Sequence, residues 1–224
     1  MFESLKLSDL SEKQCSVLRK PSNTRPILRV VDENGKRAVV KDFSVNGFLY
    51  RNIAGRFLVW REKKAYEKLD GIKGIPIFYR SINGLAIVIE ELRGKKLKAF
   101  HKTIGIPEKF YSDLYDLLNT IHSAGLAHCD LKRTPNIIVG DDGRPYIVDW
   151  AASISRSEFR FFPLSLIFKR FVRDDMDAIL KLKLKYSPEL VSQEEKDTYM
   201  NRGNIEKIIR IIRDNTRKLL KKIV

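Results

Sequence analysis

The sequence predicts an α+β protein in which an antiparallel N-terminal sheet with one helix precedes a mainly helical part. β-rich runs at 27–31 and 37–41 flank residues 32–35, whose Asn-Gly pair is a strong hairpin signal because both residues tolerate positive φ. Residues 54–69 and 107–124 instead carry apolar side chains at helical spacing. A chain of 224 residues suits one compact domain or two small lobes that share a cleft.

Three further segments complete the predicted sheet. Residues 15–18 form a candidate first strand, and residues 77–79 are strand-like. The continuous apolar run at 85–90 suits a buried strand. Gly125, directly after the helix at 107–124, is a typical C-terminal stop.

Composition limits the function classes. The formal net charge of +15 predicts attraction to anionic partners, which include nucleic acid, an acidic membrane surface and phosphorylated substrates. Cys15 and Cys129 are far apart, so no disulfide framework or zinc site follows from them. The N-terminus lacks an apolar signal core, and the apolar run at 161–168 is too short to span a bilayer, so we expect a cytoplasmic protein.

One stretch suggests chemistry. Residues 137–139 and 146–148 predict a hairpin with Asn136 just before its first strand and Asp149 just after its second. Both side chains would lie at the same end, with Asp130 on the loop that leads in. Any one of these residues alone is typical of a turn or cap. Three converging oxygen-bearing side chains suit a hard cation and a phosphate chain.

A second feature is a carboxylate on an apolar helix face. Glu62 shares one face of the predicted helix with Leu58, Ala65 and Leu69. An inward carboxylate needs a cationic partner, because its burial is otherwise costly. Lys41, at the end of a predicted strand, is the natural candidate. The alternative is that Glu62 lies at the edge of the stripe and is solvated.

One run of residues carries a specific resemblance to a known family. The run from His128 to Lys132, His-Cys-Asp-Leu-Lys, followed by Asn136 and by Val-Asp149, resembles the catalytic loop and metal-binding Asp of the protein-kinase-like superfamily. Within that superfamily it looks like the small bacterial RIO-type kinases and the kinases of lipopolysaccharide core sugars (Kdo or heptose). The resemblance covers about residues 27–190.

The resemblance implies a two-lobed protein-kinase-like fold of minimal size. Residues 1–92 would form the N-terminal lobe, whose sheet and helix cover the nucleotide. Residues 93–200 would form the C-terminal lobe with the catalytic loop and metal site. We expect residues 201–224 to form a basic amphipathic helix, which either packs on the domain or binds an anionic surface.

The resemblance also implies roles for the polar residues of the loop. Asp149 would be the main Mg²⁺ ligand, and Asn136 would hold the second metal position. Asp130 would accept or orient the proton of the attacking hydroxyl, and Lys132 would reach the γ-phosphate. His128 is expected to anchor the backbone near Asp149.

The nucleotide itself would be held from the N-terminal part. Lys41, paired with Glu62, would fix the α- and β-phosphates of ATP. Backbone groups near Glu90 and Leu92 would bind the adenine edge in the connection between the lobes. Glu90 and Leu92 are placed by position only, since backbone recognition leaves no side-chain signature.

Several features depart from the family pattern. No glycine occurs in residues 20–25, where a Gly-rich loop would cover the phosphates. One additional residue separates Asp130 from Asn136, and Trp150-Ala-Ala follows the metal Asp in place of Phe-Gly. No Ala-Pro-Glu follows, so we expect neither a phosphorylation-switched loop nor a conventional peptide-docking surface. Residues 173–177 are expected to begin a helix, with Asp174 or Asp175 either capping it or bonding the catalytic loop.

The expected activity is therefore transfer of the γ-phosphate of Mg-ATP to a hydroxyl group, on protein Ser/Thr or on a sugar of an anionic glycolipid such as lipopolysaccharide. The enzyme would be cytoplasmic or peripheral at the inner face of the membrane. One alternative is a pseudokinase or nucleotide-binding scaffold. Another is a nucleic-acid-binding module, which only the charge supports, because no basic motif interleaved with aromatic residues occurs.

Overall fold

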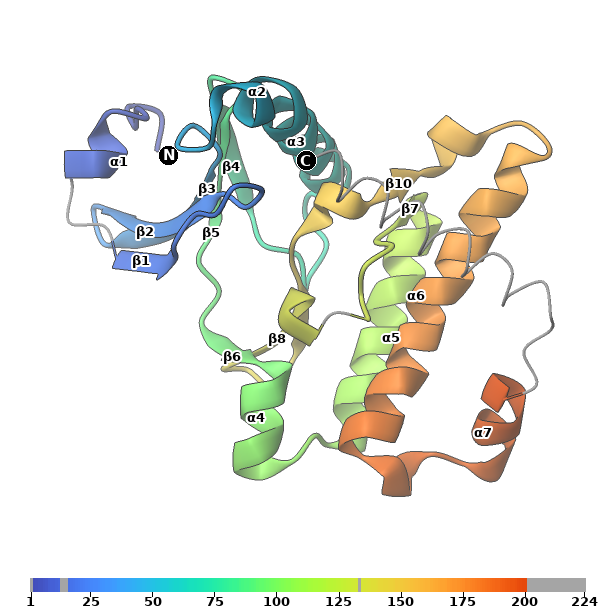
Figure 1. Cartoon of the computed structure of the whole chain (residues 1–224). Helices are drawn as coiled ribbons and strands as arrows, with labels where there is room; N and C mark the ends of the chain where they lie inside the picture. Colours follow the sequence, from blue (N-terminus) through green and yellow to red (C-terminus); the bar gives the residue numbers. More distant parts are fainter. Residues whose placement is uncertain (1, 13–15, 133, 201–224) are drawn as a thin grey trace.

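The computed structural model describes residues 2–12, 16–132 and 134–200 (Figure 1). An antiparallel N-terminal sheet with a long helix beside it forms one part of the molecule. A mainly helical part follows in the chain and lies to the other side in Figure 1. The expectation of a mixed α+β protein with an antiparallel N-terminal sheet is confirmed at this level.

The first sheet contains five antiparallel strands in the order β1-β2-β3-β5-β4. Asn34 and Gly35 both have positive φ, as the predicted hairpin between the second and third strands requires. The strands are β1 (Ser16–Arg19), β2 (Ile27–Glu33), β3 (Lys36–Asp42), β4 (Phe78–Ile82) and β5 (Ala86–Glu90).

Both faces of this sheet are buried. Because side chains alternate along a strand, Ala38 and Val40 of β3 face one way, while Val39 and Lys41 face the other. The first face packs against apolar side chains of the N-terminal segment, which contains the short helix α1 (Asp9–Glu12). No local pattern in the N-terminal segment predicted this cover. The second face receives the helix that carries Glu62.

That helix begins earlier than predicted. Helical turns start at α2 (Phe48–Tyr50), continue through a π-helical turn at Arg51–Gly55 and lead into α3 (Arg56–Lys68). The predicted start at residue 54 was wrong because the preceding apolar side chains are exposed, so no buried stripe marks these turns. Glu62 lies on the buried face of α3, as predicted.

The second part is built on two long helices that lie side by side, α5 (Glu108–Ser123) and α6 (Leu164–Tyr186). Its other helices are α4 (Leu97–Ile104), α7 (Gln193–Met200) and short 3-10 turns at Thr134–Asn136, Trp150–Ala152, Arg156–Phe159 and Pro188–Leu190. Its strands are β6 (Gly94–Lys96), β8 (Ile137–Gly140) and β9 (Pro145–Ile147), which form one sheet, and the pair β7 (Leu126–Ala127) and β10 (Ile154–Ser155). The predicted hairpin of β8 and β9 is confirmed, as is the C-terminal stop at Gly125, where φ is +78°.

The predicted helix start at residue 173 was wrong, because α6 already begins at Leu164. One buried stripe runs along α6 and includes Phe168, Asp175, Ile179 and Leu182. The acidic residues at 174–177 therefore lie inside this helix and do not mark its start. The predicted amphipathic helix at 201–224 lies outside the described residues. Across the part of the chain that is described, no helix combines the length and apolar character needed to cross a membrane.

Candidate functional site

Lys41 is the centre of a three-membered ionic cluster. Its ammonium Nζ lies 2.7 Å from Glu62 Oε2 on α3 and 2.6 Å from Asp149 Oδ1, just beyond β9. The three residues come from β3, α3 and the segment after the β8–β9 hairpin. Residues separated by up to 108 positions in sequence therefore meet at one cation.

Burial makes this cluster unusual. The Glu62 side chain is only 1% exposed and that of Lys41 is 9% exposed. Burial raises the pKa of Glu62 to about 6, although the Lys41 ammonium and a backbone hydrogen bond from Trp150 favour its ionised form. Burial acts to lower the pKa of Lys41, but the two carboxylates outweigh it and the pKa is raised. Lys41 therefore stays charged at neutral pH.

Asp149 is the solvent-facing member of the cluster. Its side chain is 44% exposed. Although partial burial opposes ionisation, Lys41 holds the pKa of this carboxyl below its usual range. The backbone of Asp149 is left-handed, with φ of +69°, a conformation that costs a non-glycine residue energy and is concentrated at functional sites. The buried Trp150 indole, whose Nε1 donates to Ile147 O at 3.3 Å, holds the adjoining turn.

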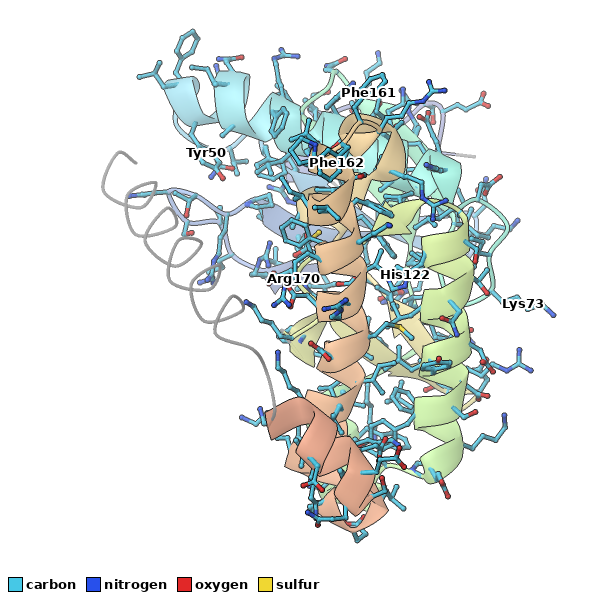
Figure 2. The ribbon with its side chains drawn as sticks, turned by 90° about the vertical axis from the view of Figure 1, so that its right-hand side faces the viewer. Tyr50, Lys73, His122, Phe161, Phe162 and Arg170 are labelled. Atoms are coloured by element: carbon cyan, nitrogen blue, oxygen red, sulfur yellow. The ribbon has the colours of Figure 1, made fainter. Side chains whose placement is uncertain are left out.

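The loop between β7 and β8 is attached to the core by Asp175. This buried carboxylate accepts hydrogen bonds from the backbone N–H groups of His128 at 2.6 Å and Cys129 at 2.9 Å. It also lies 3.2 Å from His122 Nε2 on α5, which runs alongside α6 (Figure 2). Of the two predicted candidates Asp175 takes this role, whereas Asp174 pairs with Arg170 within α6.

The same loop is tied to the residue before Asp149. His128 Nε2 lies 3.0 Å from the carbonyl oxygen of Val148, which confirms its predicted anchoring role. Val148 N–H donates to Asn136 O at 3.0 Å, so Asn136 and Asp149 lie at the same end of the hairpin, as predicted. Asn136 Nδ2 donates to the carbonyl oxygen of Asp130 at 3.1 Å. The side-chain amide oxygen, the atom that a cation would bind, is not used in that bond.

The remaining predicted residues are less closely tied to the cluster. Lys132 is exposed, two residues beyond Asp130. Glu90 and Leu92 lie at the end of β5 and just beyond it. Glu90 N–H donates to Ile77 O at 2.8 Å, and its carboxylate accepts from Ile77 N–H at 3.1 Å. The recognition of a ligand by backbone groups at Glu90 and Leu92 thus stays a prediction.

Sequence reasoning missed Arg19. It ends β1, and its guanidinium contributes to the low pKa of Asp149 while burial lowers its own pKa. Its Nε is buried without a hydrogen-bond partner, so one donor of this cation is unused beside an anionic cluster. A single arginine at a strand end carries no sequence signal, because only the fold brings it near Asp149.

Asn46 was also missed. Its Nδ2 donates to the carbonyl oxygens of Ser22 at 2.7 Å and Arg25 at 3.1 Å. Ser22 and Arg25 also bond to one another through their backbones, which closes a tight turn between β1 and β2. Tyr50 O–H donates to Thr24 O at 2.8 Å and fixes the tip of this turn. The segment that lacks glycine is therefore held from outside by two side chains.

Comparison of the sequence with models of protein families finds no match, and comparison with curated proteins finds none either. Within the described residues, no group of three or more His, Cys, Asp or Glu side chains could by itself hold a metal ion. Asp149 and Asn136 together offer a carboxylate and an amide oxygen. That set suits Mg²⁺, which takes one or two protein oxygens and completes its shell with water and phosphate oxygens.

The arrangement can therefore bind an anionic ligand together with a hard cation. Lys41 supplies a charged donor whose position is fixed by a buried carboxylate, and Arg19 adds a second cation nearby. Asp149 supplies an exposed carboxylate oxygen. Cations beside a carboxylate that suits a hard cation are what a site for a chain of phosphates requires.

Proposed function

We propose that this protein is an ATP-dependent phosphotransferase with a two-lobed, protein-kinase-like fold of minimal size. It would transfer the γ-phosphate of Mg-ATP to a hydroxyl group. The observation that supports this most directly is the buried Lys41 ammonium between Glu62 at 2.7 Å and Asp149 at 2.6 Å. The resemblance of residues 128–149 to a kinase catalytic loop supports it independently.

Lys41 and Glu62 would act by positioning. Phosphoryl transfer needs little covalent help, and catalysis depends on alignment and charge neutralisation. Glu62 fixes the Lys41 ammonium, which would donate to oxygens of the α- and β-phosphates. Arg19 would add positive charge beside these phosphates, in a region without a Gly-rich loop.

Asp149 and Asn136 would hold Mg²⁺, as their oxygen donors suit it. When bound, Mg²⁺ supplies neutralising charge to the phosphate oxygens. Asp130, whose carbonyl oxygen accepts from Asn136, would orient the acceptor hydroxyl and receive its proton. The exposed Lys132 would contact the transferred phosphate. The hydrogen bonds of Asp175 and His128 keep this loop in register with Asp149.

The acceptor would be a hydroxyl on a protein or on an anionic glycolipid such as a lipopolysaccharide core sugar. The segment after Asp149 is short, with two 3-10 turns and the two-residue strand β10 before α6. Such a segment leaves little chain for docking a peptide, which favours the glycolipid. The net charge of +15 also favours an anionic acceptor.

A nucleotide-binding scaffold without transfer activity is the second candidate. Residues 20–25 contain no glycine, so no Gly-rich loop would cover the phosphates, and this departure supports a scaffold. A scaffold would bind nucleotide and release no labelled product.

The test is incubation of the full chain with γ-labelled ATP and a cell-envelope extract. We expect label to enter lipid or protein, and the Asp149→Ala variant to lower transfer at least about 100-fold, since metal-assisted charge stabilisation is worth several kcal/mol. Asp141→Ala, in the exposed turn between β8 and β9, is the matched control and should remain active. ATP binding without transfer would favour the scaffold. Transfer by Asp149→Ala at the unsubstituted rate would refute the site.

A further inference from the structure

Exposed apolar side chains form a stripe on the outer face of α2 and α3. Leu49, Ile53 and Phe57 follow at intervals of four, and Trp60 continues the series after three, so they share one face of the helix. All are exposed, from 45% for Trp60 to 73% for Leu49. The opposite face carries the buried Val59, Glu62 and Tyr66 of α3. This helix therefore has a second apolar face that the fold does not cover.

A second exposed apolar group lies where the chain enters α6. Phe161 is 73% exposed and Phe162 is 81% exposed, and Leu164, Leu166 and Ile167 follow as exposed residues. Figures 1 and 2 show α2 and the start of α6 at the same upper end of the molecule, where Figure 2 labels Phe161 and Phe162. The two segments that carry these apolar groups therefore lie at one end of the molecule. Monomeric proteins rarely expose this much clustered apolar surface without a partner.

Cations are interleaved with these apolar residues. Lys64 Nζ lies 4.1 Å from the centre of the Trp60 ring, the Arg61 guanidinium lies 5.6 Å from that of Phe57, and that of Arg51 lies 5.5 Å from that of Phe48. Residues 48–64 contain one acidic residue, Glu62, which is buried against Lys41. Arg61 is only 17% exposed and pairs with Glu158 at 3.3 Å, so Lys64 and Arg51 are the cations that accompany the exposed apolar side chains.

The start of α6 adds a basic cavity. A cavity of about 500 Å³ there is lined by Arg156, Arg160, Lys169 and Arg173, with Phe159 and Phe168 among its apolar walls. None of its lining residues is acidic. The four cations are exposed, and the Arg156 guanidinium lies 5.4 Å from the centre of the Phe168 ring. A cationic cavity beside two exposed phenylalanines suits a phosphate that is attached to an acyl chain.

We propose that this face docks on a bilayer that contains anionic lipid. Phe161, Phe162 and the α2–α3 stripe would enter the interfacial region, and the cavity at the start of α6 would take lipid phosphate groups. Charge complementarity selects this occupant, because a second copy of the chain would bring the same positive charges together. Amphipathic helices with Lys and Arg beside Trp and Phe bind anionic membrane surfaces in this way. The proposal does not depend on phosphoryl transfer.

Sedimentation of the full chain with lipid vesicles tests the proposed docking. We expect the protein to sediment with vesicles of phosphatidylcholine that contain about one quarter phosphatidylglycerol, and weakly or not at all with vesicles of phosphatidylcholine alone. The reason is that each cation near an anionic surface contributes about fivefold in affinity. Phe161→Ser with Phe162→Ser should lower binding at least about tenfold. The double variant Leu49→Ser with Ile53→Ser, in the α2–α3 stripe, should also lower vesicle binding at least about tenfold. Ile77→Ser with Tyr115→Ser, two exposed residues elsewhere, is the matched control and should bind as the unsubstituted chain does.

Trp60 gives a direct readout. The chain has two tryptophans, and Trp150 is fully buried, so a blue shift of emission on adding anionic vesicles reports Trp60. Trp60→Phe should abolish the shift while vesicle binding persists. Because all substituted apolar positions are exposed, thermal melting should show that each variant is folded. If one double variant does not fold, the other still tests the proposal.

Four outcomes would overturn the proposal. The first is unchanged vesicle binding in both apolar variants, and the second is sedimentation with vesicles without a change in Trp60 emission. The third is a dimer in solution that Phe161→Ser with Phe162→Ser dissociates, in the absence of vesicle binding, because the face would then join two copies. The fourth is salt-sensitive retention on duplex nucleic acid without vesicle binding. Residues 201–224 are identical in every variant, so their contribution cancels in these comparisons.

Discussion

Replacement of Glu62 by Gln tests the buried ionic cluster through the pH dependence of stability. The Glu62 side chain is almost completely buried, and its pKa is raised from 4.5 to about 6. Folding therefore favours its protonated form, and this contribution is fully present below about pH 4.5. It is lost as the pH rises through 6, where the folded protein must ionise a buried carboxyl.

The magnitude follows from the size of the shift. One pKa unit corresponds to about 1.4 kcal/mol, so a rise from 4.5 to about 6 corresponds to about 2 kcal/mol. The unsubstituted protein should lose about that much free energy of unfolding, relative to Glu62→Gln, between pH 4 and pH 7. Gln keeps the size of Glu and does not titrate, and groups that titrate equally in both proteins cancel in the difference.

Urea unfolding followed by circular dichroism, at several pH values between about 4 and 7.5, measures this. With an m-value of roughly 2 kcal/mol per M urea, the difference in midpoint between the two proteins should change by roughly 1 M across the range. Glu67→Gln, on the exposed side of the same helix, should leave the profile unchanged. Parallel pH profiles for the unsubstituted protein and Glu62→Gln would refute a raised pKa at Glu62 and the burial that causes it.

Two further predictions concern the surrounding residues. Asp175→Ala should lower the free energy of unfolding by about 3 kcal/mol or more, because the buried N–H of His128 and the partly buried N–H of Cys129 both lose a charged acceptor. Asp174→Ala should cost less than about 1 kcal/mol in the same denaturation assay. Equal effects of the two substitutions would contradict the anchoring role of Asp175. If the chain binds ATP as proposed, Arg19→Gln should weaken binding by about tenfold in a calorimetric titration, whereas Lys20→Gln, one residue along, should change it less than about threefold. Equal losses in both variants would show general charge attraction rather than a specific contact.

The sequence was sufficient where local patterns carry the information. The Asn-Gly pair predicted the β2–β3 hairpin because few residues adopt positive φ without cost. The spacing of apolar residues predicted the buried face of α3, including Glu62. It failed at the starts of two helices, since the turns from Phe48 have no buried stripe and the acids near residue 174 lie within α6.

The candidate site was predicted in part for the same reason. Asn136 and Asp149 could be placed together because a hairpin brings its two ends into register. The pairing of Lys41 with Glu62 followed from the cost of burying a lone carboxylate. Arg19, Asn46 and the choice of Asp175 over Asp174 could not be predicted, because each depends on contacts between segments distant in sequence.

The sequence by itself thus determined the α+β class, the main strands and helices, and the polar residues that meet at the end of the β8–β9 hairpin. Local backbone preferences and side-chain periodicity are sufficient for these features. Only the tertiary structure decided that Lys41 bridges both Glu62 and Asp149, and that the outer face of α2 and α3 is apolar yet uncovered. Distances across the chain and exposure to solvent depend on how whole elements pack, and no local pattern encodes them.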